Sequence, residues 1–574
     1  MARTNAANVT GPQAPPVTGQ ELRMGTRYRP QRLSGPYDAI IIGSGLGGLS
    51  TAGCLARMGK KVLVLEQHYT IGGFTHCFEK DGYEWGTGLH YVGGMGTRTP
   101  LSNVMNYITQ GKLEWADMGE NYDSYFLDGD RFDVLVGEGK FKAALLQKFP
   151  NEGPALESYL ALIREAAPAA QAFFGRKFFS RRMARLLNPL LRRRAPDYIN
   201  TPAYDVIKSI TQNEKLIGVL LGQWGGCGTP PKRMSFVMHA GAVSHYMEGA
   251  FYPVGGSSQV ARTILPVIEH TGGSVFSYAS VDQILVKKGR AVGVRMKDGT
   301  EINCTTIISG AGFYNTYEHL LSRQDAGAMN AQPDVDALEP SSAHIGLFIG
   351  MKKTAREMNL PKTNYWIQPS FDHDDNHTSF WNDSDAAFPL IYVTFPASKD
   401  PEFEARYPHK STIEIVVLTP YEHFEKWDGT AWGDRGVEYE AFKEKMKDRI
   451  LAELYKVLPQ IEGEIDVCEV STPLTTKYFN NGKFGEIYGL AHTPERYNDQ
   501  WLRIQTPIKG LYMTGQDAMS MGIAGATIGG FMTALKLLSW RERFKLLKNL
   551  SSPENKAPPI HTDAPLEANA QAVE

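Results

Sequence analysis

The sequence predicts an α/β fold of two lobes, a first lobe built on a parallel sheet and a mixed second lobe. The chain has 574 residues, too many for one ordinary hydrophobic core. A buried strand, a glycine-rich turn and a helix follow one another near residues 40–56 and again near 510–530. Helical stretches and long β-rich runs lie between them and predict the second lobe.

The first glycine-rich segment predicts a cradle for a pyrophosphate. Residues 40–42 are three isoleucines typical of a buried strand, and Gly43, Gly45 and Gly48 follow with GxGxxG spacing. The first glycine permits a tight turn, the second lets a phosphate approach the backbone, and the third allows close helix packing. The helix then presents unpaired N–H groups to the phosphates. A turn that serves packing alone is the alternative, but a helix and a second strand follow in the required order.

An acidic residue and a second glycine pair extend this motif. The strand at 62–65 ends at Glu66, whose carboxylate can accept hydrogen bonds from two ribose hydroxyls and would repel a 2′-phosphate, which argues against NADP. Gly72 and Gly73 come next, ahead of the segment YEWGTGLHYVGG. This order resembles the extended dinucleotide motif of the phytoene desaturase and flavin amine oxidase superfamily. The resemblance implies a tightly held FAD rather than an exchanging nicotinamide, and a Rossmann-like FAD-binding domain.

The same resemblance assigns further residues to the FAD site. In that superfamily the segment after the second glycine pair passes beside the isoalloxazine ring, which implies that Gly88, His90 and Tyr91 lie near it. The segment GLYMTGQDAMSMGIAGATIGG resembles the closing motif, in which an acid accepts a ribityl or ribose hydroxyl and a helix points its positive end at the flavin N1/O2 edge. The residues implied there are Gly515, Asp517 and Gly522.

A predicted meander, taken with the resemblance, implies that the FAD-binding domain is discontinuous. Residues 281–312 read as three strands joined by turns, followed by an apolar strand and another glycine turn. Superfamily members carry this meander in the flavin domain, which implies that Val281 contacts the adenine through its backbone. The predicted parts are a flexible arm at 1–36, FAD-binding domain at 37–95, 251–325 and 465–540, substrate domain at 96–250 and 326–464, and a C-terminal tail at 541–574.

The second lobe predicts a place for an apolar ligand. Its first part reads as mostly helical, and its second part holds β-rich runs and a helix with one apolar face. That face comprises Tyr439, Phe442, Met446, Ile450 and Leu454. A sheet backed by helices with many aromatic residues can enclose an elongated apolar ligand or can be plain core. Periodicity does not separate these two possibilities.

Several phrases narrow the resemblance to the branch of retinol saturases (all-trans-retinol 13,14-reductases) and carotenoid isomerases. They include GLHYVG, PASKDPEFEARYP, IEIVVLTPYEHFEKW and STPLTTKYF, and the likeness covers nearly all of 37–540. Phe74 and Thr75 stand where many amine oxidases have a basic residue, which argues against amine oxidation. Gly86 departs from the branch, which often has an aspartate there.

This branch implies an FAD-dependent oxidoreductase that saturates a carbon–carbon double bond in a long apolar polyene or unsaturated lipid, with hydride from flavin N5. The substrate classes are retinoid, carotenoid and fatty acid. One alternative is a polyene isomerase or desaturase on the same scaffold. Another is a non-catalytic binder of prenyl or lipid groups, as in the similar Rab GDP-dissociation inhibitors. The combination of Glu66, Gly72, Gly73 and Asp517 argues against this binding role. His90 and Tyr91 are the candidate proton donors, although a histidine there can equally hold the flavin.

Composition excludes several other functions. Lys and Arg number 60 against 62 Asp and Glu, so no global charge indicates a nucleic-acid partner. The cysteines are far apart and lack a CxxC pair, so we expect reduced thiols and no zinc. His239 and His245 do not share a helix face, so no metal site is expected. No GxSxG nucleophile elbow occurs, which argues against the usual serine hydrolase. No second complete GxGxxG occurs either, so a separate NADPH domain is not expected and the electron donor is unassigned.

A basic segment predicts contact with a membrane surface. Residues 176–194 hold eight basic residues and no acidic one, interleaved with Phe, Met and Leu. Such a segment can sit on anionic headgroups at about 1 kcal/mol per basic residue, or can be a solvated helix. Residues 535–550 are a second basic amphipathic candidate, which could instead cap the flavin domain. Neither a signal peptide nor a spanning helix is predicted, so we expect a cytoplasmic protein or one peripheral to the cytoplasmic face of a membrane.

Overall fold

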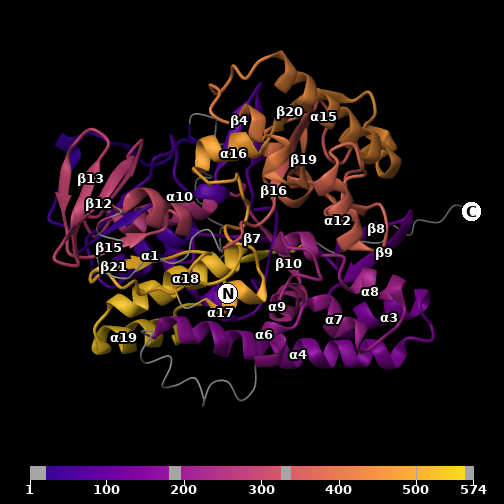
Figure 1. The fold of residues 1–574 in the computed structure, drawn as a ribbon, viewed down its shortest axis with the longest axis horizontal. Helices are drawn as coiled ribbons and strands as arrows, with labels where there is room; N and C mark the ends of the chain where they lie inside the picture. Colours follow the sequence, from indigo (N-terminus) through magenta and orange to yellow (C-terminus); the bar gives the residue numbers. More distant parts are fainter. Residues whose placement is uncertain (1–20, 180–195, 323, 325–337, 500, 563–574) are drawn as a thin grey trace, which may run out of the picture.

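A parallel sheet of six strands forms the centre of the first lobe (Figure 1). The computed structural model describes residues 21–179, 196–322, 324, 338–499 and 501–562. The strand AIII is buried at all four positions, as expected for a parallel sheet covered on both faces. In spatial order the strands are β1 (Thr26–Arg27), β11 (Ser274–Ser277), β3 (Val62–Leu65), β2 (Ala39–Ile42), β15 (Ile307–Ser309) and β21 (Leu511–Met513).

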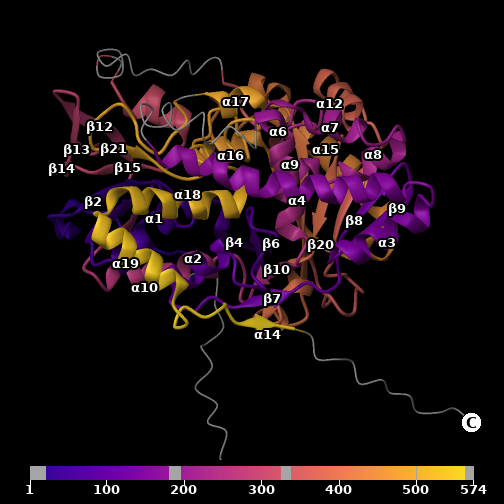
Figure 2. The ribbon, with the colours of Figure 1, turned by 90° about the horizontal axis from the view of Figure 1, so that it is seen from below.

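Helices from three distant parts of the chain cover one face of this sheet. Their apolar residues form one core with β2 and β3, and Figures 1 and 2 show α1 and α18 side by side. A Cβ atom at Gly53 of α1 would lie 3.0 Å from the Cβ of Ile108 in α2, so these helices pack closely. The covering helices are α1 (Leu46–Arg57), α2 (Pro100–Thr109), α10 (Gln259–Glu269) and α18 (Gly522–Leu537).

The predicted meander packs on the opposite face. It forms a three-stranded antiparallel sheet in which β13 is central, and its apolar residues share a core with β2, β3 and β15. The strands are β12 (Val281–Lys287), β13 (Arg290–Met296) and β14 (Glu301–Asn303). The apolar strand after the meander is β15, which pairs in parallel with β2 and β21, so the discontinuous chain closes one sheet.

A sheet of seven strands forms the second lobe. Its longest pair, β16 and β19, runs antiparallel in unbroken register from Ala343 opposite Thr419 to Met351 opposite Ser411. In spatial order the strands are β20 (Ile465–Ser471), β16 (Ala343–Met351), β19 (Ser411–Thr419), β18 (Ile391–Thr394), β17 (Asn364–Gln368), β8 (Asn121–Leu127) and β9 (Asp130–Leu135).

Helices cover both faces of this second sheet. Helix α15 (Val437–Val457) buries Tyr439, Met446, Ile450 and Leu454 against one face, which confirms its predicted apolar stripe. The other face packs on helices of the first interruption, among which the long α4 (Gly153–Gly175) runs along the lobe in Figure 2. Helices α8 (Glu214–Leu220) and α9 (Phe236–Tyr246) belong to the same core. Other helices among the described residues of this interruption are α3 (Glu138–Lys148), α6 (Pro196–Asn200) and α7 (Ala203–Lys208).

Three short segments differ from their sequence-based expectation. Within the predicted arm, β1 pairs with β11, and within the predicted tail, β22 (Ile560–His561) pairs with β7 (Trp115–Asp117). Helix α19 (Trp540–Ser551) instead agrees with the basic amphipathic segment predicted at 535–550. The predicted helical region 96–250 also contains β7, β8 and β9. Strand edges offer unpaired N–H and C=O groups to whichever segment reaches them, and composition does not reveal that partner. Residues 1–20 and 563–574 lie outside the described part of the chain.

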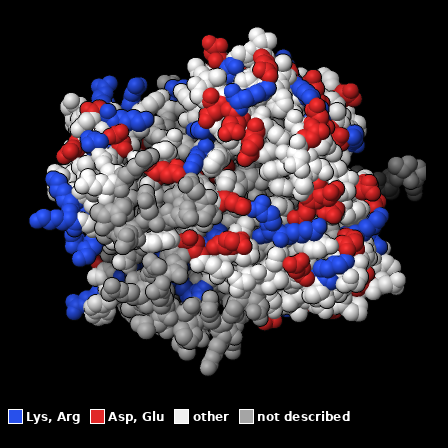
Figure 3. All heavy atoms as spheres, in the orientation of Figure 1, with Lys and Arg blue, Asp and Glu red and all other residues white. Residues whose placement is uncertain are grey.

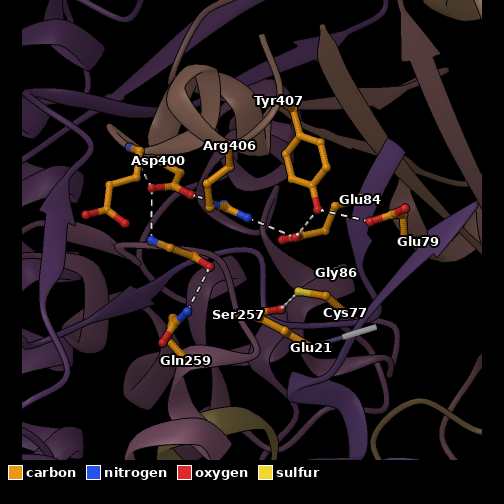
Figure 4. A network of polar contacts seen from close by, with 12 residues as sticks. Glu21, Cys77, Glu79, Glu84, Gly86, Ser257, Gln259, Asp400, Arg406 and Tyr407 are labelled. Carbon is orange, nitrogen blue, oxygen red and sulfur yellow. Dashed lines mark hydrogen bonds and ion pairs between the residues drawn. The ribbon is translucent and has the colours of Figure 1, made fainter. Parts of the chain in front are cut away.

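A buried ion network ties the two lobes together (Figure 4). Arg406 donates to Glu84 (2.8 Å) in β5 (Tyr83–Gly86) and to Asp400 (2.5 Å), and all three side chains are at most 5% exposed. Asp400 also accepts the Gly255 N–H (3.0 Å), and Tyr407 donates to Glu84 (2.8 Å). Burial raises the pKa of Glu84, while Arg406 opposes that effect. The network therefore holds β5, which leads into the site, against the second lobe.

The face of the protein that Figure 3 draws shows no single dominant charge. On the face drawn in Figure 3, acidic and basic side chains mix over the lobe built on the seven-stranded sheet. This mixture agrees with a formal net charge of -2. None of the helices in the described ranges is long and apolar enough to cross a membrane.

Candidate active site

A cavity of about 1380 Å³ is lined by residues of both lobes and by segments from both ends of the chain. Every residue that the sequence assigned to the cofactor or to catalysis lies in its wall. These residues are Gly43, Gly45, Gly48, Glu66, Gly72, Gly73, Gly88, His90, Tyr91, Val281, Gly515, Asp517 and Gly522. The fold therefore brings the predicted set together in one place.

The glycine turn after β2 is shaped by close backbone contacts. Gly43 has a φ of +91°, which favours glycine, and a Cβ at Gly48 would lie 2.1 Å from the Gly43 carbonyl oxygen. A Cβ at Gly45 would meet no protein atom within 4 Å, so this glycine faces the open cavity. Helix α1 starts at that point without a side-chain cap, which leaves its first N–H groups for a ligand.

Glu66 is held in place by residues that sequence reasoning missed. Its Oε2 accepts the backbone N–H (2.8 Å) and the hydroxyl (2.7 Å) of Ser44, and its Oε1 accepts the N–H of His68 (2.8 Å). The Ser44 hydroxyl also accepts the Gly72 N–H (3.1 Å). Ser44 thus links the first glycine turn, the acid and the second glycine pair. Its position inside GSGLGG was the available signal.

The second glycine pair packs directly on the first turn. A Cβ at Gly73 would lie 2.8 Å from the Cα of Gly45, and the φ of Gly73 is +55°. Gly88 lies equally close to Phe74, since a Cβ there would be 3.0 Å from the Phe74 side chain. These contacts explain the glycine requirement through the protein itself, before any cofactor is considered.

Asp517 is positioned by two other segments of the chain. One carboxylate oxygen accepts the Phe313 N–H (2.7 Å) and the other accepts the Leu490 N–H (3.3 Å). A Cβ at Gly489 would lie 2.1 Å from Asp517 Oδ1, so this acid is closely enclosed. Helix α18 then begins at Gly522, has no side-chain cap, and contributes residues to the cavity wall.

His90 forms a pair with a buried carboxylate of the second lobe. Its Nδ1 lies 2.9 Å from Oε2 of Glu414 in β19, whose side chain is 1% exposed. The other Glu414 oxygen accepts the N–H of Gly86 (2.5 Å). Gly86, which stands where the branch often has an aspartate, therefore presents its backbone N–H to an acid from another strand. Glu414 was not singled out by the sequence, because only strand pairing in the second lobe brings it to His90.

Tyr91 belongs to a separate buried network. Its hydroxyl donates to Asp123 (3.0 Å) and accepts from Gln223 (3.1 Å), and Gln223 also donates to Asp123 (2.8 Å). Burial raises the pKa of Tyr91 well above its usual value and raises that of Asp123 to about 6. The Tyr91 hydroxyl is committed to this network, and its ring stacks on Tyr246 with centroids 4.5 Å apart.

A lysine completes the polar layer behind the cavity wall. Lys399 is buried and donates to the His90 carbonyl (3.1 Å), the Asn364 side chain and the Thr394 hydroxyl. Burial lowers its pKa to about 7. Asn364 in turn donates to Asp123 (2.9 Å). Backbone and side-chain bonds thus fix the segment that carries His90 and Tyr91.

The part of the cavity beyond His90 is largely aromatic and aliphatic. Tyr392 lies beside His90, with ring centroids 5.4 Å apart, and packs edge-on against Trp366 at 4.7 Å. His344 lines the same wall, and burial lowers its pKa to about 4. Further apolar residues of this wall are Val237, Met238, Tyr246, Leu390, Val416 and Leu418. Such a surface suits an apolar ligand.

Comparison with known proteins decides the family. The model of the family described as flavin containing amine oxidoreductase matches residues 46–538. The chain belongs to this family. It is an FAD-dependent oxidoreductase with the expected α/β fold.

Similar proteins narrow the place of this flavoprotein within the family. The human all-trans-retinol 13,14-reductase is 34% identical over 95% of this chain and 93% of its own length. The chloroplastic prolycopene isomerase of Daucus carota is 25% identical over 87% of this chain and 79% of its own length. The solved cyclohexylamine oxidase from Brevibacterium oxydans superposes with a TM-score of 0.57 over 90% of this chain and all of that chain, at 14% identity. The last likeness concerns the fold alone.

The residues of this flavoprotein fit FAD. Two uncapped helix N-termini, at α1 and α18, meet one cavity, and each is accompanied by a buried acid from the same end of the chain. The N–H donors suit a pyrophosphate and an electron-rich ring edge, and the carboxylates suit hydroxyl groups. The open space at Gly45 is where the backbone must admit a phosphate.

The histidines and cysteines that the sequence analysis considered lie in structural environments. No cluster of three or more His, Cys, Asp or Glu that could hold a metal occurs in the described ranges. His239 lies 3.0 Å from the Tyr159 hydroxyl, and His245 accepts the Gly93 N–H (2.9 Å). All five cysteines are unpaired thiols. Burial raises the pKa of Cys227 above its usual value, which disfavours the reactive thiolate.

Proposed function

We propose that this flavoprotein saturates a carbon–carbon double bond in a long apolar polyene or unsaturated lipid of the retinoid, carotenoid or fatty-acid type. The names of the retinol reductase and prolycopene isomerase relatives support a polyene substrate. The aromatic and aliphatic cavity wall supports an apolar one. The observation that carries the choice of reaction is the pair formed by His90 and Glu414.

His90 acts as the proton donor in this proposal. FAD, when bound, supplies a hydride donor and acceptor at N5. Saturation also requires a proton at the second carbon, from a group in the cavity wall. An ionised carboxylate accepts hydrogen bonds only, so Nδ1 of His90 donates to Glu414 and Nε2 is left for the cavity.

Glu414 prepares His90 for this role. Its carboxylate fixes the orientation of the imidazole ring, as a carboxylate does behind a catalytic histidine. The Gly86 N–H and the enclosure of Glu414 hold the carboxylate still. Tyr91 takes a positioning role instead, because its hydroxyl is already bonded to Asp123 and Gln223.

The alternative reactions use the same cavity differently. In desaturation His90 would accept the proton that it donates in saturation, since one group serves both directions. Isomerisation needs no net proton transfer, and the name of the prolycopene isomerase relative supports this alternative. A histidine paired with a buried carboxylate in the wall favours the reactions that move a proton.

Product mass decides between these reactions. The protein, reduced under anaerobic conditions, is incubated separately with a retinoid, a cis-carotenoid and an unsaturated fatty acid. A gain of two hydrogens in one of them is the expected result. A loss of two hydrogens, or unchanged mass with altered chromatographic retention, would refute saturation and identify desaturation or isomerisation.

The proposed cellular setting is the cytoplasmic face of a membrane, where an apolar substrate is available. The basic segment 176–194 remains the sequence-based argument for this contact, and its residues 180–194 lie outside the described part of the chain. Phe178, at its start, lies beneath the cationic groups of Lys536 and Arg543, at 5.0 and 5.4 Å from the ring centroid.

A further inference from the structure

Helix α19 carries an apolar stripe that faces solvent. Trp540, Phe544 and Leu547 are 73%, 69% and 46% exposed. Their spacing of four and then three residues places them on one face of the helix. Seven large hydrophobic side chains are exposed in the described ranges, and three of them gather on this one helix. The adjacent side of α19, about 100° around the helix, buries Leu546 and Leu550 in the core of the first lobe.

A basic stripe runs beside the apolar one. Arg541, Lys545 and Lys548 each follow a member of the apolar stripe by one residue, and all three are exposed. One residue turns an α-helix by about 100°, so the two stripes are neighbours on the surface. No ion pair joins these three cations to an acid among the residues that the structure describes.

The acidic residue of α19 does not neutralise this face. Glu542 pairs with Lys60 (2.7 Å) and accepts the Ser539 hydroxyl and backbone N–H as part of a capping box. Its bonds to Lys60 and Ser539 lower its pKa to about 2. The exposed face of α19 therefore combines three apolar side chains with three uncompensated positive charges.

The neighbouring helix connects this face with the cavity. Helix α18 ends at Leu537, shortly before α19 begins, and its Ile528, Phe531 and Met532 line the cavity. Both ribbon views place α19 at the outer edge of the first lobe, next to α18 (Figures 1 and 2). A surface that held α19 would thus lie beside a helix that borders the ligand space.

We infer that α19 docks this protein on an anionic lipid bilayer. Trp540, Phe544 and Leu547 enter the boundary between headgroups and acyl chains, where an indole ring is especially favourable, and the cations lie at the level of the phosphates. An apolar stripe alone would suit any apolar partner. The adjacent basic stripe without acids selects an anionic surface, and the absence of a spanning helix in the described ranges makes this contact peripheral.

Vesicle flotation tests this inference without any catalytic measurement, so its outcome is independent of the proposed reaction. The FAD-loaded full chain is mixed with phosphatidylcholine vesicles, with and without about one third phosphatidylserine. We expect binding to the anionic vesicles that weakens as salt rises. The triple change Trp540→Ser, Phe544→Ser and Leu547→Ser, and separately Arg541→Glu, Lys545→Glu and Lys548→Glu, should each weaken it at least about tenfold.

A matched control comes from an exposed aromatic pair elsewhere. Trp432 and Tyr478 are 52% and 58% exposed and stack on each other, so their change to serine should leave vesicle binding unaltered. Melting temperature and flavin absorbance establish that each variant is folded. Unchanged binding of either α19 variant, or equal binding of the wild type to neutral vesicles, would overturn the inference. A dimer that the serine variant dissociates, without vesicle binding by the wild type, would instead assign this face to a second copy.

Discussion

A Cβ atom at Gly47, in the first turn of α1, would lie 2.4 Å from the Cα of Gly515, which follows β21 near the other end of the chain. The two glycine-rich segments are therefore in direct backbone contact. A Cβ at Gly530 of α18 would likewise lie 2.5 Å from the Gly47 carbonyl oxygen. This junction brings both halves of the FAD site together, and it distinguishes glycines needed for packing from those needed for the ligand.

Alanine changes at Gly45 and Gly47 should separate folding from FAD binding. Gly47→Ala forces the two segments apart, and we expect it to lower the free energy of unfolding of the apoprotein by about 1–3 kcal/mol. Gly45→Ala adds a methyl group to open cavity space and should leave the apoprotein stable while weakening FAD binding. Thermal melting of apoprotein and flavin fluorescence titration measure the two effects. Equal effects of both changes on both quantities would contradict this division.

Neutralising the two buried acids should weaken FAD binding. Glu66→Gln places an amide where the Ser44 and His68 N–H groups donate, and Asp517→Asn does the same opposite Phe313 and Leu490. A hydrogen bond from an FAD hydroxyl to a charged carboxylate contributes about 1.5–3 kcal/mol. We therefore expect each variant to lose roughly 10- to 100-fold in FAD affinity. Dilution and ultrafiltration of the holoprotein report the retained flavin. Full retention in both variants would rule out the assigned roles.

The proton donor can be identified by comparing three variants. His90→Gln should lower the turnover rate by about 10²–10⁴-fold with flavin retained, since it removes the general acid. Glu414→Gln should lower turnover, because the carboxylate that orients the imidazole is lost.

Tyr91→Phe is the matched change in this series. It keeps the ring stacked on Tyr246 and removes only the hydroxyl bonded to Asp123, so we expect turnover within a few-fold of wild type. Stopped-flow rates at several pH values distinguish these outcomes from a change in substrate affinity. A loss in Tyr91→Phe as large as that in His90→Gln would transfer the role of donor to Tyr91.

The buried arginine between the lobes should be important for stability. Arg406→Met leaves the carboxylates of Glu84 and Asp400 without their partner, and breaking a buried pair in this way costs about 3–5 kcal/mol. Lys80→Met breaks an exposed pair with Glu469 and should cost about 0–1 kcal/mol. Urea denaturation compares the two. Similar midpoints for both variants would show that the network in Figure 4 does not hold the lobes together.

Stability should fall as the pH is lowered from 6.5 towards 4. Burial lowers the pKa of seven histidines to about 4, so below pH 6.5 the unfolded chain binds protons that the folded chain does not. Each contributes a slope of up to about 1.4 kcal/mol per pH unit. They are His68, His76, His239, His245, His344, His373 and His377.

Acidic groups with raised pKa values oppose this trend but are fewer than the histidines. Burial raises the pKa of Asp123 and Asp374 to about 6 and that of Glu486 to about 7, so these groups favour the folded state as the pH falls. Urea midpoints of apoprotein at pH 7, 6 and 5 measure the balance, and His239→Gln should reduce the slope. A midpoint that rises or stays constant between pH 6.5 and 5 would contradict the predicted sign.

Much of the first lobe was predictable because its signals are local. The strand, glycine turn, helix and terminal acid between residues 40 and 66 follow one another in the sequence, and each has a residue type dictated by its own geometry. The meander was equally readable from alternating strands and turn residues. The strands of the arm, of the tail and of β7–β9 were not predictable, because their structure depends on which strand edge they reach.

The sequence by itself determined the family resemblance, the cofactor that this resemblance implies and a set of residues that meet in one cavity, since these rest on motifs with a defined spacing. Only the tertiary structure decided which groups support those residues. Ser44 reaches Glu66 through a turn, whereas Glu414 reaches His90 through strand pairing in another lobe. The assignment of α19 as a surface helix with an exposed apolar stripe was also decided by packing, because Leu546 and Leu550 take the buried side. Local periodicity shows that a helix has faces, but burial of one face depends on the distant segments that pack against it.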